Sequence, residues 1–155
     1  MIGLGYDSHR FEAGRPLILG GVRVEHDRGL AGHSDADVLT HAVIDALLGA
    51  AGLGDIGQHF PDTDERWRDA DSIALLGAVC EMLAAEALRI VNVDATVVME
   101  RPKLGAHRAE MRARLAGTMG IDERRMNVKA TTGEGMGFVG RQEGVAALAV
   151  AALEG

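Results

Sequence analysis

The chain has 155 residues, 47% of them hydrophobic, which is typical of a single soluble domain with one hydrophobic core. Its formal net charge of -7 and its aromatic content of 3% argue against nucleic acid as a partner, because phosphates are bound through cations and bases stack on aromatic rings. No leader segment or membrane-spanning apolar run is evident, and the lone Cys80 lies in an apolar stretch, so we expect a cytoplasmic protein without membrane contact.

Hydrophobic periodicity and turn residues predict strands and helices along the whole chain. In chain order we expect strands over 1–7 and 16–25, helices over 35–51 and 69–88, a strand over 91–99, a helix over 106–119, and strands over 126–131 and 143–153. Ser34 is the expected N-cap of the first helix, and Gly20-Gly21 predicts a hairpin turn or a bulge. On propensity alone, the alanine-rich last segment is equally compatible with a helix. The arrangement predicts an α+β class fold over residues 1–155, a sheet with helices packed on one face, as in a ferredoxin-like sandwich.

A carboxylate and an imidazole stand two residues apart near the N-terminus. On an extended strand, Asp7 and His9 present their side chains to the same face. A catalytic zinc site usually takes three protein ligands. The third candidate is His41, which follows Asp37 and precedes Asp45 at helical spacing. The pattern predicts a metal site, although such pairs also occur by chance and helical histidines are more often solvated or part of the core.

Three loops carry more polar chemistry than a connector needs. Residues 54–64 combine carboxylates, glycines and an aromatic ring, and are either a binding loop or a solvated acidic turn. Residues 101–104 bring two cations to a strand end, as ordinary surface or as a phosphate contact. Residues 129–141 hold glycines, paired threonines, a glutamate and an arginine, which favours phosphate and metal binding because glycines let backbone N–H groups approach oxygens. The P-loop pattern is absent, and we expect no Gly-x-Gly-x-x-Gly that follows a strand and opens a helix, so neither kind of nucleotide-binding motif is predicted.

These motifs, taken together, are specific. The chain resembles the family of 2-C-methyl-D-erythritol 2,4-cyclodiphosphate synthases, which act in the non-mevalonate isoprenoid pathway. The resemblance rests on residues 5–11, 33–37, 54–57, 60–64, 127–132 and 140–141, in order and over essentially the whole chain. It implies an enzyme that converts 4-diphosphocytidyl-2-C-methyl-D-erythritol 2-phosphate to the cyclic diphosphate by intramolecular phosphoryl transfer. In that reaction the 2-phosphate attacks the β-phosphorus and CMP leaves.

The resemblance also implies a role for each matched residue. Asp7, His9 and His41 would hold one Zn²⁺ per active site, and Glu134 would help hold Mg²⁺ or Mn²⁺ on the substrate diphosphate. His33 and Thr132 would be catalytic, stabilising the transition state. The erythritol would be held by Asp55, Ile56, Gly57, Phe60, Pro61, Asp62, Thr63 and Asp64. The cytidine pocket would be formed by Met99, Glu100, Arg101, Pro102, Lys103, Leu104, Gly105, Ala130 and Thr131. Further substrate contacts would come from Ser8, Ser34, Gly133, Phe138 and Arg141.

The family assembles as a homotrimer with active sites at subunit interfaces, so the resemblance implies the same here. Phe138, Arg141 and Glu143 would line a central cavity, where they bind an isoprenoid diphosphate or simply close the threefold axis. Gly133 stands where many relatives have threonine, and Gly135-Met136 replaces a common Lys-Leu pair, so we expect a looser loop.

Two other classes of function are compatible with parts of the sequence. One is a metal-dependent hydrolase that cleaves a nucleotide diphosphate with an activated water. The other is a non-enzymatic trimer that binds an isoprenoid diphosphate. Product analysis separates the first from a cyclase, and the intact set of metal and phosphate ligands argues against the second.

Overall fold

A mixed five-stranded sheet is the centre of the protein, which we describe from a computed structural model covering residues 1–155. The strands lie in the order β4-β1-β7-β5-β6. Their bounds are β1 (Ile2–Ala13), β4 (Arg28–Leu30), β5 (Arg89–Val98), β6 (Met126–Thr131) and β7 (Gly144–Glu154). All neighbours pair antiparallel except β5 and β6, which are parallel. A separate hairpin consists of β2 (Leu17–Leu19) and β3 (Val22–Val24).

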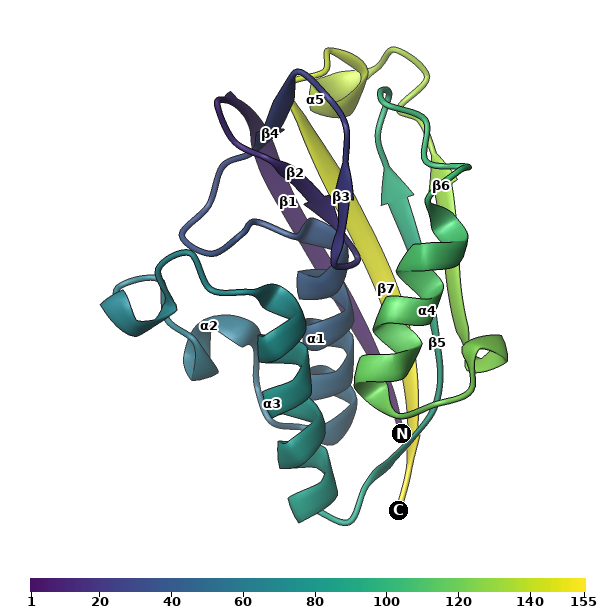
Figure 1. Ribbon diagram of the computed structural model, residues 1–155. Coiled ribbons are helices and arrows are strands. Elements are labelled where there is room, and N and C mark those ends of the chain that lie inside the picture. Colours follow the sequence, from purple (N-terminus) through teal and green to yellow (C-terminus); the bar gives the residue numbers. More distant parts are fainter.

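The long helices cover one face of this sheet (Figure 1). They are α1 (Val38–Ala51), α3 (Ser72–Ala85) and α4 (Arg108–Met119). The short elements are α2 (Ile56–His59), α5 (Gly137–Gly140) and two 3-10 turns, η1 (Glu65–Trp67) and η2 (Glu123–Arg125). Helix α1 is buried on nearly every side, because it lies between the sheet and α3. None of the helices is both long and apolar enough to cross a membrane.

Two glycines of β1 determine how closely α1 approaches the sheet. A Cβ atom on Gly5 would lie 1.9 Å from the carbonyl oxygen of Ala42, and one on Gly3 would lie 2.1 Å from that of Ala46. Only residues without a side chain permit this contact. The consequence is functional, since the same approach brings His41 on α1 next to the side chains that follow Gly5 on β1.

The α+β class and the placement of the helices on one face are confirmed, whereas the ferredoxin-like detail is not. A ferredoxin-like sandwich has the element order β-α-β-β-α-β. In this chain α4 instead connects β5 to its parallel neighbour β6, and β6 then leads to β7 without a long helix between them. The alanine-rich last segment forms β7, so the strand interpretation is confirmed and the helical one is wrong.

Helix α1 begins later than predicted. Its N-cap is Asp37 and not Ser34, because the Asp37 carboxylate accepts hydrogen bonds from the backbone N–H of Thr40 and from the Thr40 hydroxyl. Ser34 instead accepts a hydrogen bond from the N–H of Ala36, whose φ of 57° lies in the left-handed region. Helix α3 is shorter than the predicted 69–88, and the predicted strand over 16–25 is divided into β2 and β3 by the turn at Gly20-Gly21. Strand β1 is longer than predicted, and the sequence patterns did not predict β4, α2, α5, η1 or η2.

Candidate metal centre and active site

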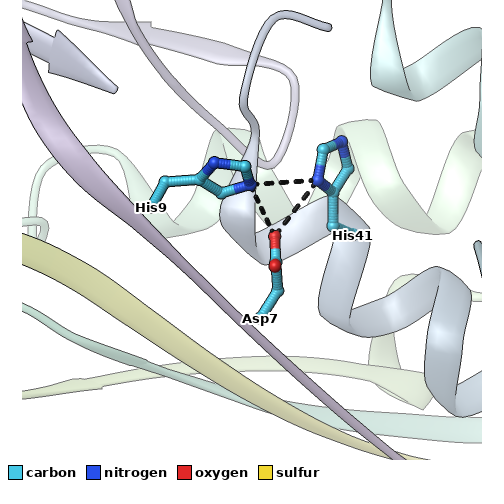
Figure 2. A group of neighbouring side chains, drawn as sticks. All are labelled: Asp7, His9 and His41. Atoms are coloured by element: carbon cyan, nitrogen blue, oxygen red, sulfur yellow. Dashed lines mark hydrogen bonds and ion pairs between the residues drawn. The ribbon is translucent and has the colours of Figure 1, made fainter. Parts of the chain in front are cut away.

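One carboxylate oxygen and two imidazole nitrogens converge where β1 faces α1 (Figure 2). The Oδ2 atom of Asp7 lies 2.8 Å from Nε2 of His9 and 3.1 Å from Nδ1 of His41. The two nitrogens are 3.3 Å apart. Ligands of a tetrahedral zinc ion with bonds of about 2.0–2.1 Å are separated by roughly 3.3 Å. The three predicted ligands therefore come together closely enough to share one metal ion.

The remaining ring nitrogens of both histidines are engaged away from this centre. Nδ1 of His9 lies 2.7 Å from the carbonyl oxygen of Ala31, so Nδ1 donates, and in the neutral ring Nε2 carries the lone pair. Nε2 of His41 lies 2.7 Å from the hydroxyl of Ser72. Metal-binding histidines characteristically make such a second hydrogen bond. The donor set thus fits a divalent cation in its orientation as well as in its chemistry.

Electrostatics keep the Asp7 carboxylate ionised. Burial alone would raise its pKa, but the neighbouring imidazoles of His41 and His9 outweigh this effect and lower the pKa from 3.8 to about 2. For His9, burial would lower the pKa, yet the hydrogen bond to Asp7 and the charge of that carboxylate raise it above 6.5. The ionised Asp7 carboxylate is therefore the negative group of the cluster, and it stabilises positive charge placed beside it.

The cluster opens into a cavity of about 400 Å³. Its lining includes most of the predicted metal and phosphate or erythritol contacts: Asp7, His9, His33, Ser34, His41, Ile56, Gly57, Phe60, Pro61 and Asp62. The Nε2 atom of His33 lies 3.0 Å from the backbone oxygen of Asp64, so His33 is tied to the loop that closes the cavity. Segments far apart in sequence thus meet at one site.

Some predicted members of this site have other contacts. Asp55 is the N-cap of α2, where its side chain accepts from the N–H of Gln58. The carboxylate of Asp64 pairs with Arg66 at 2.6 Å, and this pairing lowers the Asp64 pKa. Neither Asp55, Thr63 nor Asp64 lines the cavity. Ser8 points to a different hollow, next to Phe138 and Glu143.

The two aspartates at helical spacing from His41 do not join the metal cluster. Asp37 is fully buried and binds the backbone N–H groups of Gly20 and Gly21 at 2.9 and 2.7 Å, which ties the hairpin to α1. Asp45 accepts a hydrogen bond of 2.8 Å from the N–H of Ile56, and its burial raises its pKa. Asp45 therefore fixes Ile56, the first residue of α2, which lines the cavity.

The sequence analysis missed several residues of this region, of which two make specific contacts. Trp67 lines the cavity, with its ring edge-on to Phe60 at 5.1 Å between centroids. Ser72 contacts His41 from the first turn of α3. No local pattern marks either residue, because each acts through a contact with a segment distant in sequence.

A second, smaller cavity of about 70 Å³ lies at the ends of β5 and β6. Parallel strands end at the same edge of a sheet, so residues after β5 meet residues at the end of β6. The lining residues are Met99, Pro102, Lys103, Leu104, Ala130, Thr131 and Thr132. All of them were predicted for the cytidine pocket except Thr132, which was predicted to be catalytic. Glu100, Arg101 and Gly105 do not line it. The two cavities share no residue.

The glycine-rich loop after β6 is held by hydrogen bonds. The N–H of Gly133 donates to the carboxylate of Glu100 at 2.6 Å, and the N–H of Met136 donates to the Gly133 oxygen at 2.9 Å. A Cβ atom on Gly133 would lie 3.0 Å from Met136 oxygen and 3.1 Å from the Glu100 carboxylate. Glycine at this position therefore permits close packing. Glu134 in this loop is exposed and has a φ of 53°.

An α+β domain in which a carboxylate and two imidazoles line a cavity is a framework that can hold a metal ion at an enzyme active site. The chain belongs to the YgbB family, whose family model matches residues 1–154. It is 62% identical over 153 residues to the 2-C-methyl-D-erythritol 2,4-cyclodiphosphate synthase of Salinibacter ruber, covering 99% of this chain and 98% of the relative. It is 59% identical over 155 residues to the synthase of the same name from Symbiobacterium thermophilum, covering 100% of this chain and 99% of the relative.

A solved structure supports the same relationship. A 2-C-methyl-D-erythritol 2,4-cyclodiphosphate synthase in its CDP-bound form matches with a TM-score of 0.91 and 40% identity, over 99% of this chain and 100% of that chain. The family resemblance carried by the sequence motifs is thereby confirmed, and so is the enzyme class, a cyclodiphosphate synthase.

Proposed function

We propose that this chain converts 4-diphosphocytidyl-2-C-methyl-D-erythritol 2-phosphate to 2-C-methyl-D-erythritol 2,4-cyclodiphosphate and CMP. The observation that carries this proposal is the convergence of Asp7, His9 and His41 in the wall of a cavity that also contains His33 and Ser34. A bond forms between a 2-phosphate oxygen and the β-phosphorus, and the bond from the β-phosphorus to CMP breaks. The nucleophile is already an anion, so the reaction needs charge neutralisation and positioning more than a base.

Two metal ions are part of this proposal. Asp7, His9 and His41 would hold Zn²⁺, and Glu134 would contribute an oxygen ligand to Mg²⁺ or Mn²⁺. When bound, these ions supply Lewis-acid neutralisation of phosphate oxygens. The carboxylate of Asp62 in the same cavity is an acceptor suited to the erythritol hydroxyls.

The products distinguish this proposal from its nearest alternative. Incubation of the zinc-loaded protein with the diphosphocytidyl substrate and Mg²⁺ should release CMP and the cyclic diphosphate in equal amounts, as followed by ³¹P NMR. Acyclic phosphates in place of the cyclic product would identify a hydrolase. The names of the curated relatives favour the cyclase.

His33 and Thr132 are the proposed transition-state donors. Replacing either by alanine should lower kcat by roughly 10²–10³, the range for one lost donor, with a smaller effect on KM. Steady-state kinetics of both variants test this expectation. His107→Ala and Thr118→Ala are matched controls on α4, outside both cavities, and should keep wild-type rates. A raised KM with intact kcat would reassign the residue to substrate binding.

Cytidine recognition is assigned to the second cavity. Lys103 provides a cation at its rim, and Thr131 and Thr132 provide hydroxyls. The CDP-bound structure of the related synthase supports a nucleotide as the ligand. Because this cavity shares no residue with the metal cavity, we infer that a neighbouring subunit completes each active site.

The face of the sheet opposite the helices supports assembly into a trimer. It exposes Ile2, Leu4, Tyr6, Leu148 and Val150. Leu148 is directly opposite Tyr6, and Val150 is opposite Leu4, so these side chains form one continuous apolar patch. Packing three such faces around a threefold axis would bury the patch.

Charge on this patch should prevent assembly. Leu148→Lys is expected to convert the trimer to monomers in sedimentation velocity and to abolish activity, because a lysine in the centre of the patch would be buried without a partner. The outward-facing Ala113→Lys on α4 is the control and should remain trimeric. A trimeric Leu148→Lys protein would exclude this face as the interface.

The role of the central cavity stays a prediction. The guanidinium of Arg141 lies 3.2 Å from the carboxylate of Glu143, and Phe138 stands exposed beside Ser8 and Arg10. Arg141 would bind an isoprenoid diphosphate only if this ion pair opened, and the same pair would equally close the threefold axis.

A further inference from the structure

The side of the His41 ring that faces away from the metal cluster belongs to a buried chain of hydrogen bonds. Nε2 of His41 lies 2.7 Å from the hydroxyl of Ser72, which is fully buried at the start of α3. That hydroxyl also bonds to the Oδ1 atom of Asp35. The Asp35 carboxylate is fixed in turn by the N–H groups of Ser72 and Asp37, at 3.1 and 3.2 Å.

The direction of these hydrogen bonds follows from the number of protons. An ionised carboxylate only accepts, so the single hydroxyl proton of Ser72 is donated to Asp35. The Ser72 oxygen must then accept from His41, which requires the proton of the neutral ring to be on Nε2. The lone pair is left on Nδ1, the atom that lies 3.1 Å from Asp7. The opposite tautomer would place an N–H in the centre of the metal cluster.

We propose that Asp35 and Ser72 are positioning residues that hold His41 in the Nε2–H tautomer and thereby set the metal affinity of the site. This inference rests on the metal centre of the proposed function and adds the side chains that orient it. His9 is oriented by the backbone oxygen of Ala31, which no substitution removes. The side chains of Asp35 and Ser72, in contrast, can be removed by substitution, so their effect on the orientation of the His41 ring can be tested.

A purely structural role for the Ser72 hydroxyl is a weaker explanation. The N-cap of α3 is Asp71, and the N–H of Ser72 reaches Asp35 without the hydroxyl. A second hydroxyl, that of Ser34, lies 3.2 Å from Nε2 of His41 and provides a longer contact. Loss of the Ser72 hydroxyl should therefore weaken the orientation of the ring without eliminating it.

Ser72→Ala tests the proposal in the full-length protein. Its dissociation constant for Zn²⁺, measured by competition with a chromogenic chelator, should rise about 10–100-fold, the range for lost outer-shell partners. The absorption spectrum of the Co²⁺-substituted protein should change as well. Thr40→Val is the matched control, because it removes a buried hydroxyl that donates to Asp37 at 2.7 Å but does not contact the His41 ring. It should lower stability and leave zinc affinity unchanged.

A measurement on the wild-type apoprotein keeps the test independent of whether a variant folds. Side-chain ¹⁵N NMR at a pH where His41 is neutral should show its Nε2 protonated, with His41→Ala used for assignment. An Nδ1–H tautomer, or a folded Ser72→Ala protein whose zinc affinity stays within about threefold, would overturn the role of the pair. A wild-type protein that binds no zinc would instead refute the proposed metal centre.

Discussion

Bound zinc is expected to fall well below one ion per protomer in His41→Ala, and cyclisation should be lost with it. His41 supplies one of only three converging ligand atoms. Removing a direct ligand should weaken zinc binding by more than the roughly 100-fold upper range for an outer-shell partner. Metal analysis of the purified variant, together with CMP release, tests both parts of this expectation.

The fold should survive this substitution. The apolar side chains of α1, among them Leu39, Ile44 and Leu48, keep their contacts, and Ser72 keeps its bond to Asp35. The loss of the His41 hydrogen bonds should cost about 1–3 kcal/mol of unfolding free energy. His107→Ala controls for the general loss of an imidazole and should retain zinc. Full zinc occupancy in folded His41→Ala protein would remove His41 from the site.

Strand and helix periodicity predicted much of the metal centre because it describes local geometry. The two-residue spacing placed Asp7 and His9 on one face of a strand, and the structure confirms that they meet. Their meeting with His41 depends on a different property, the close packing of α1 on Gly3 and Gly5. Glycine in a strand does not reveal which helix will lie against it, so this contact could not be predicted from spacing alone.

Helical spacing gave a wrong prediction for Asp37, because this residue caps α1 and does not belong to its first turn. Asp37 stands four residues before His41, which predicts a shared face, but α1 has not yet begun at that position. The Asp37 side chain instead caps the helix and binds the hairpin. Ser72 could not be predicted for a different reason: its role depends on a contact with His41, which lies 31 positions away in the sequence. Such contacts become visible only once α1 and α3 are placed side by side.

Activity is expected to return when two inactive variants are unfolded and reassembled together. His9→Ala removes the metal half of the site, and Lys103→Glu reverses the charge at the rim of the second cavity. In a trimer whose sites are shared between neighbours, each site needs one intact half from each of two subunits. Random mixing in equal amounts should therefore restore about a quarter of the sites.

A matched mixture tests whether this recovery has the proposed origin. His9→Ala and His41→Ala both damage the metal half, so no combination of these subunits contains an intact one, and their mixture should stay inactive. Differently tagged subunits would show that mixed trimers form in both experiments. The two cavities share no lining residue within one chain, which is why we expect them to be separable between chains. If mixed trimers of His9→Ala and Lys103→Glu form without any CMP release, both halves of the active site must belong to the same subunit.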